Sequence, residues 1–218
     1  MDPGMNQLLK WSVENSTDPR ADPTSTSDPK AVRPSGRPLN AEALAALMGG
    51  PSDADLMKDA MSAIVTPSIS LENKLTAFDN FEQLIETIDN ANNMSNLGLW
   101  TPLIRQLDSE VPELRKMAAW CIGTAAQNNI KSQETVLTTG ALTKLISKTL
   151  EDKDGGVRKK AVYALSSSVR NYQPAVDLMV EKLPREILGD GVDRLDASDM
   201  DGIDSIMEKL RAIAKETR

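Results

Sequence analysis

Residues 114–122 read LRKMAAWCI, and residues 157–165, 43 positions later, read VRKKAVYAL. The basic pair, the small residue, the aromatic and the aliphatic residue all coincide, and at the same spacing Asn128 falls on Asn171. A core stripe with the 3.6-residue period of a helix repeats with them. It comprises Leu114, Ala118, Cys121, Ile122 and Ala125 in one helix, and Val157, Ala161, Ala164, Leu165 and Ser168 in the other. A looser copy, one further repeat towards the N-terminus, predicts Leu71, Leu75 and Phe78 as its stripe.

A second match connects these helices. Residues 98–104 (GLWTPLI) resemble residues 140–146 (GALTKLI) at an offset of 42, in the same order along the chain. A helical period of roughly 40 to 47 residues is typical of armadillo and HEAT repeats, in which each unit buries its apolar face by stacking on its neighbours. The predicted fold class is therefore all-α, an armadillo-like helical-repeat solenoid with a flexible N-terminal segment.

The sequence divides into five parts. We expect residues 1–16 to be a short N-terminal helix or peptide motif. Residues 17–38 carry five prolines among polar residues, which predicts a disordered linker. N-terminal helices follow at 39–67, where Ser52 and Asp55 have the spacing of a capping box. The armadillo-like repeats occupy 68–184, and an acidic loop with a C-terminal capping helix occupies 185–218.

Composition excludes several classes of function. The net charge of −7 argues against nucleic acid or an anionic membrane as the main partner, because both need a cationic surface. The sequence contains no histidine and no glycine-rich phosphate loop. Residues 196–202 are similar to a calcium-binding loop, but the first ligand position of that loop lacks the carboxylate that calcium binding needs. We therefore predict a protein that is not an enzyme, with no catalytic residues, no cofactor and no metal. A single cysteine and a first segment unlike a secretory signal favour the cytoplasm, and we expect a monomer.

Several stretches resemble the fungal Fes-type co-chaperones, relatives of the armadillo nucleotide exchange factors of cytosolic 70-kDa heat-shock chaperones. They are residues 89–93 (DNANN), 97–100 (LGLW), 113–115 (ELR), 118–129 (AAWCIGTAAQNN) and 157–167 (VRKKAVYALSS), with 8–12 (LLKWS) and 41–48 near the N-terminus. The resemblance implies an armadillo domain that binds the ATPase domain of the chaperone and promotes release of ADP, aiding release of the substrate polypeptide. A fourth repeat known in longer relatives looks reduced here.

The long third helix of each armadillo repeat lines the concave surface, so side chains rotated away from the core stripe become candidate contacts with the partner. Aromatic, basic and amide groups suit that role, because aromatic side chains and arginine dominate interface hot spots. The candidates are Asn73, Ala77, Asn80, Lys116, Trp120, Thr124, Gln127, Asn128, Lys159, Tyr163, Ser167, Arg170 and Asn171. Trp120 and Tyr163 could instead pack between repeats, and Lys116 and Lys159 could be ordinary solvated residues.

The resemblance also implies that the N-terminal segment occupies the peptide site of the chaperone, and Leu8, Leu9, Trp11, Leu44, Leu47 and Met48 would serve as the substrate mimic. The alternative function is an armadillo adaptor that binds an extended peptide in its groove without exchange activity. Peptide-binding armadillos of that kind carry Asn one turn after each groove tryptophan, whereas this sequence has Thr124 and Ser167 there. Whether the acidic stretch 186–204 contacts a partner is left open.

Overall fold

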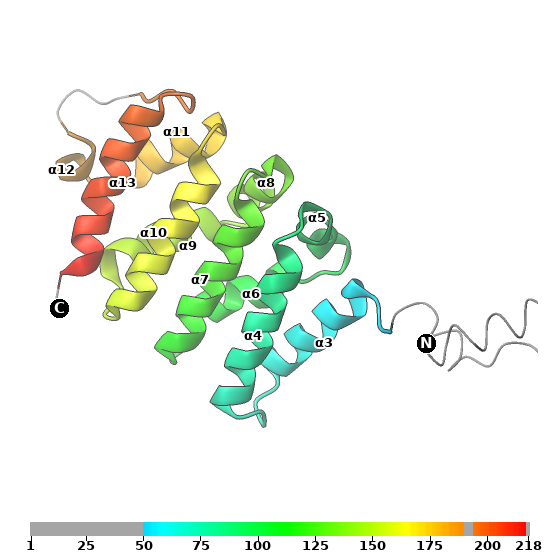
Figure 1. Ribbon diagram of the computed structural model, residues 1–218. Coiled ribbons are helices and arrows are strands. Elements are labelled where there is room, and N and C mark those ends of the chain that lie inside the picture. The colour runs from blue at the N-terminus through cyan, green and yellow to red at the C-terminus, as the bar shows by residue number, and fades with distance from the viewer. Residues whose placement is uncertain (1–49, 190–193, 217–218) are drawn as a thin grey trace, which may run out of the picture. The chain divides into compact units, whose positions relative to one another are not determined.

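The computed structural model describes residues 50–189 and 194–216, and within them every regular element is a helix (Figure 1). The predicted substrate-mimic residues Leu8, Leu9, Trp11, Leu44, Leu47 and Met48, and the predicted linker, lie outside these residues. The helices are α3 (Asp53–Val65), α4 (Leu71–Ile85), α5 (Ile88–Asn96), α6 (Trp100–Arg105), the 3-10 helix η1 (Gln106–Asp108), α7 (Pro112–Ala126), α8 (Ile130–Thr138), α9 (Ala141–Glu151), α10 (Gly155–Val169), α11 (Gln173–Lys182), α12 (Arg185–Leu188) and α13 (Met200–Lys215). All of them belong to one compact unit that begins at Asp53.

The helices repeat in threes. In α5–α6–α7 and again in α8–α9–α10, two shorter helices precede one of 15 residues, and α11–α12–α13 follows the same order with a shrunken middle helix. The long helices pack side by side in the order α4, α7, α10 and α13, and Figure 1 looks onto this row. This architecture confirms the all-α, armadillo-like prediction, including the reduced last unit.

The predicted core stripe is confirmed in α7 and α10. Leu114, Ala118, Cys121 and Ile122 are buried, as are Val157, Ala161, Ala164, Leu165 and Ser168. In α4 the register differs from the prediction. Phe78 is buried as predicted and Leu75 is half-buried, but Leu71 is 40% exposed. The buried apolar side chains of α4 are Ala77, Phe78, Phe81 and Ile85. The spacing from α4 to α7 is 40 residues and not 43, because the buried positions that correspond to Ala118, Cys121 and Ala125 are Phe78, Phe81 and Ile85. This difference of three residues rotates the buried side of α4 relative to the prediction.

The repeated arginine of each basic pair fixes the loop that precedes its helix. Arg115 donates from Nη1 to the carbonyl oxygens of Ser109 and Glu110, at 2.8 and 3.2 Å. Arg158 donates from Nη1 to the carbonyl oxygens of Asp152 and Lys153, at 2.7 and 3.1 Å. For both arginines, the acceptors belong to the residues six and five positions earlier in the chain. Both arginines thus satisfy backbone carbonyl groups of the loop that precedes their helix, which accounts for the repeat of arginine at these two positions.

Arg115 also ties consecutive units together through Asp152. Its Nε and Nη2 donate to the two carboxylate oxygens of Asp152, each at 2.8 Å. Burial alone would raise the pKa of Asp152, but the hydrogen bonds from Arg115 and from the Asp154 N–H outweigh it and hold that pKa below its ordinary value. A bidentate pair of this kind fixes both distance and orientation between α7 and the loop before α10.

The first described helix, α3, lies within the predicted N-terminal helices 39–67 and ends just before Thr66 and Pro67. Met57, Met61 and Ile64 are buried from it, whereas Leu56 is exposed. None of the helices in the described part of the chain combines the length and apolar character that crossing a bilayer requires.

Candidate partner-binding face

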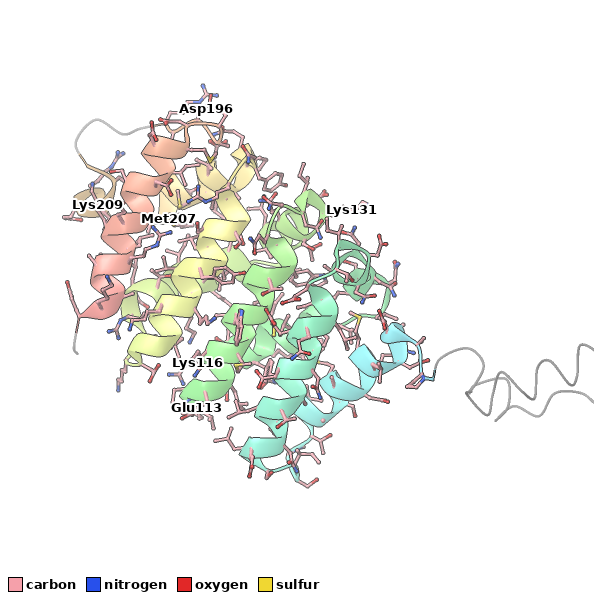
Figure 2. The ribbon with its side chains drawn as sticks, in the orientation of Figure 1. Glu113, Lys116, Lys131, Asp196, Met207 and Lys209 are labelled. Carbon is pink, nitrogen blue, oxygen red and sulfur yellow. The ribbon has the colours of Figure 1, made fainter. Side chains whose placement is uncertain are left out.

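The long helices α4, α7, α10 and α13 present one continuous surface, and we call the surface carrying Trp120, Thr124, Tyr163 and Arg170 the row face. Most of the predicted contact residues are accessible to a partner there. Asn73, Asn80, Gln127, Asn128, Lys159 and Asn171 are exposed, and Lys116, Trp120, Thr124, Tyr163 and Arg170 are half-buried. Figure 2 shows Lys116 on α7, beside the first turns of α10.

Two of the predicted contact residues are buried. Ala77 is 8% exposed and Ser167 is 9% exposed, so neither side chain offers much surface to a partner. For Ala77 the cause is the changed register of α4 described above. Ser167 is buried because α8 packs against the end of α10, where Gln133 Nε2 donates to the Ser167 carbonyl oxygen at 2.9 Å.

Polar contacts join each long helix to the next across the row face. Thr124 Oγ1 on α7 donates to Glu82 Oε1 on α4 at 2.6 Å, and the Tyr163 hydroxyl on α10 donates to Gln127 Oε1 at 3.1 Å. Arg170, at the end of α10, forms an ion pair with Asp204 on α13. These contacts hold the spacing of the row, which gives a partner a preorganised surface.

Arg170 is more constrained than an ordinary surface arginine. Its Nε donates to Ser166 Oγ at 3.1 Å, its Nη1 lies 3.5 Å from Met200 Sδ, and its Nη2 binds Asp204. The hydrogen bond from Arg170 holds the pKa of Asp204 below its ordinary value. Replacing Arg170 would therefore disturb the junction of α10 and α13 as well as any contact with a partner.

A cation lies over the central aromatic ring of the row face. Lys160 Nζ is 3.5 Å from the centroid of the Trp120 ring and 5.6 Å from that of Tyr163, an arrangement that a cation–π attraction stabilises. Burial lowers the pKa of Lys160, nearby Lys116 lowers it further, and Glu82 acts in the opposite direction. Sequence reasoning missed Lys160 because its counterpart in the preceding repeat is Met117, so the repeat carried no signal for it.

Asn128 and Asn171 recur for a reason of backbone geometry. Both have positive φ, 54° and 57°, and each directly follows the C-cap residue of its helix, Gln127 for α7 and Arg170 for α10. Asparagine tolerates this left-handed conformation better than most residues, and it commonly terminates a helix there. Their side chains remain exposed, so their contact with a partner stays a prediction.

The polar and ionisable groups on and beneath this face suit contact with a partner protein. Burial raises the pKa of the Cys121 thiol well above its ordinary value, with Glu82 and Asp79 adding to the effect, so the sulfur stays protonated within the core. In the ranges 50–189 and 194–216, no group of three or more Cys, Asp or Glu side chains is placed to hold a metal ion. What the row face offers is a set of amide, aromatic and cationic groups on rigid helices.

Comparison with known proteins identifies the family of the chain. The family described as nucleotide exchange factor Fes1 matches residues 5–94, and the SIL1/FES1/HPBP1 C-terminal domain matches residues 90–189. A protein of Gibberella zeae, named Hsp70 nucleotide exchange factor FES1, is 52% identical over 214 residues, which cover 96% of each chain. The chain belongs to the Fes1 family.

Other Fes1-family relatives match over nearly the whole length as well. A Coccidioides immitis protein of the same name is 52% identical over 216 residues, covering 98% of this chain and 99% of its own. A Neurospora crassa relative, named Hsp70 nucleotide exchange factor fes-1, is 46% identical over 244 residues and 99% of both chains. Among solved structures, a crystal structure of an engineered protein matches with a TM-score of 0.55 and 18% identity, covering 78% of this chain and 71% of that one, a likeness of fold alone.

Proposed function

We propose that this chain is a cytoplasmic, monomeric co-chaperone that binds the ATPase domain of a 70-kDa heat-shock protein through the row face and promotes release of ADP. The observation that carries the proposal is whole-length similarity, at 52% identity, to proteins named Hsp70 nucleotide exchange factor. The fixed spacing of α4, α7, α10 and α13 supports it physically, because a rigid surface loses little conformational entropy on binding.

No bond needs to be made or broken by the chain for this activity. A protein that binds the nucleotide-poor form of the ATPase domain more tightly than the ADP-bound form shifts the equilibrium by its differential affinity. By reciprocity, ADP weakens binding of the exchange factor by the same factor, typically about 5- to 150-fold in such couplings. Release of ADP then follows from docking alone.

The adaptor alternative finds less support on this face. A groove that reads an extended peptide needs amides free to pair with the peptide backbone, one turn after each groove aromatic. Thr124 at one such position is already bonded to Glu82, and Ser167 at the other is buried. The N-terminal substrate-mimic role of Leu8, Leu9, Trp11, Leu44, Leu47 and Met48 is proposed on the resemblance to the family alone.

Stopped-flow release of fluorescent ADP from a cytosolic 70-kDa chaperone tests the proposal. Gln127→Arg places a long charged side chain at an exposed position beside Tyr163 on the row face and should reduce the acceleration by about tenfold at matched concentration, because it obstructs the interface. Asn96→Arg introduces the same side chain at an exposed position on α5, away from the row face, and should accelerate release as the wild type does.

The outcomes separate the two functions. No acceleration by the wild type at saturating concentration would overturn the exchange activity and favour the adaptor. Acceleration that Gln127→Arg leaves unchanged would retain the exchange activity but remove the row face as its binding surface.

A further inference from the structure

A hollow of about 270 Å³ opens between α10 and α13, beside Tyr163 on the row face. Its interior is apolar and is formed by Val162 and Ala214, with Ser166 at one side. Three cationic side chains stand around it, Lys159 from α10 and Arg211 and Lys215 from α13, and all three are exposed. The hollow is large enough for one aliphatic or aromatic side chain of a partner.

The charge around the hollow is opposite to that of the protein. The chain carries a net charge of −7, yet no acidic residue lines this hollow. Within the described ranges, none of the ion pairs involves Lys159, Arg211 or Lys215, and Asp204, the carboxylate that influences Arg211, is already bound to Arg170.

We infer that this hollow binds an acidic segment of the chaperone's ATPase domain, with one apolar side chain inside and carboxylates against Lys159, Arg211 and Lys215. The inference rests on the proposed function and adds the chemistry of the contact. Apolar burial supplies affinity, and the surrounding cations select a negatively charged partner and accelerate its encounter. Since the rest of the protein is acidic, this region is where an acidic surface can approach without repulsion.

Zero-length carbodiimide cross-linking, which joins an amine to a carboxylate in direct contact, tests the inference on the full chain with the ATPase domain. Mass spectrometry should find Lys159 and Lys215 joined to aspartate or glutamate residues of the ATPase domain. Lys131 on α8 and Lys182 on α11, both exposed but remote from the hollow, should stay unlinked. Cross-links through Lys131 or Lys182, with none through Lys159 and Lys215, would overturn the inference.

A pair of neutralising variants gives an independent measurement. Arg211→Gln with Lys215→Gln should weaken binding of the ATPase domain by roughly threefold to thirtyfold at low salt, and should flatten the decline of affinity with added salt. Lys131→Gln with Lys182→Gln changes the net charge equally and should bind as the wild type does. Equal effects of the two double variants would attribute the loss to overall charge and overturn the site.

The remaining outcomes are also decisive. If wild type fails to bind the ATPase domain at all, the proposed function fails. If wild type binds and the Arg211 and Lys215 variant is unchanged in affinity and in salt dependence, only the hollow is lost. Sedimentation showing a wild-type dimer that the same variant dissociates would assign the hollow to a second copy of the chain, against the inference.

Discussion

Gly123 sets how closely α7 and α10 approach beneath the row face. A Cβ atom placed there would lie 2.6 Å from Cδ1 and Cε1 of the Tyr163 ring and 2.9 Å from the Cα of Ala164. The ring could rotate away, but the backbone of α10 could not without moving the helix. A glycine within a helix normally costs stability, so its presence here indicates that the close contact is worth more than that cost.

Gly123→Ala should therefore lower the free energy of unfolding by about 1–2 kcal/mol, because overpacking outweighs the better helix propensity of alanine. Urea denaturation measures the change. Gly155→Ala is the matched control at the start of α10, where the nearest atom to the new Cβ would be Arg158 Nη2 at an ordinary 3.4 Å. The control should be neutral or slightly stabilising, and equal losses in both variants would contradict the role of Gly123.

Repetition at 43 residues predicted burial well but did not reveal why individual residues recur. The arginines Arg115 and Arg158 recur because each binds loop carbonyls, and the asparagines Asn128 and Asn171 because each ends a helix with positive φ. The cation over Trp120 comes from the following repeat, so no pattern within one helix could have located Lys160. Contacts between repeats depend on how two helices are turned against each other, which a single helical period does not specify.

At the scale of elements, α13 is fastened to α10 at both ends. Arg170 pairs with Asp204 in the first turns of α13, and Arg158 Nη2 donates to the carbonyl oxygen of Glu216 at its far end. The Arg158 side chain is 2% exposed, and its hydrogen-bond acceptors are carbonyls at the ends of α9 and α13. The negative ends of two helix dipoles therefore stabilise this buried cation.

Arg158→Ala should lower the free energy of unfolding by about 2–4 kcal/mol and loosen the end of α13, because buried carbonyls lose their donor. The rate of tryptic cleavage after Lys209, Arg211 and Lys215 reports on that loosening, and cleavage after Lys74 on α4 is the internal control. Lys159→Ala, at the exposed neighbouring position, should leave both rates unchanged. Cleavage in α13 that stays as slow as in wild type would show that Arg158 does not hold the helix.

The register of α4 illustrates what a repeat spacing can and cannot predict. The spacing of 43 residues carried the stripe correctly from α7 to α10 but misplaced Leu71, because the repeat that follows α4 is three residues shorter. Three residues turn a helix by nearly one full turn, so a small error in spacing moves a buried position to the side of the helix. Phe78 was predicted correctly because it stands in the stripe under either spacing.

In the molecule as a whole, each helical unit contacts mainly its neighbours along the row. Stability in such a stack is approximately the sum of the units and their interfaces, so a unit covered on both sides is held more firmly than one at an end. The fold class was predictable from this same property, because units that need neighbours must repeat in the sequence. The partner was not, since the same architecture hosts unrelated partners and only similarity to relatives pointed to one.

Hydrogen exchange followed by mass spectrometry should show this gradient. Amides of α7 and α10 should be protected most, and those of α3 and α13 should exchange at least about tenfold faster, because the end units open without disturbing the centre. The gradient should persist in Gly155→Ala, which leaves the interfaces intact. Equal protection of α3 and α7 would mean that the unit opens only as a single body.

The row of long helices also sets the width of the surface that a partner can contact. Packed helices lie about 8–10 Å apart, so the three intervals from α4 to α13 measure roughly 25–30 Å, about the diameter of a small domain. A partner that touches all four helices at once must therefore present a surface about as wide as a small domain.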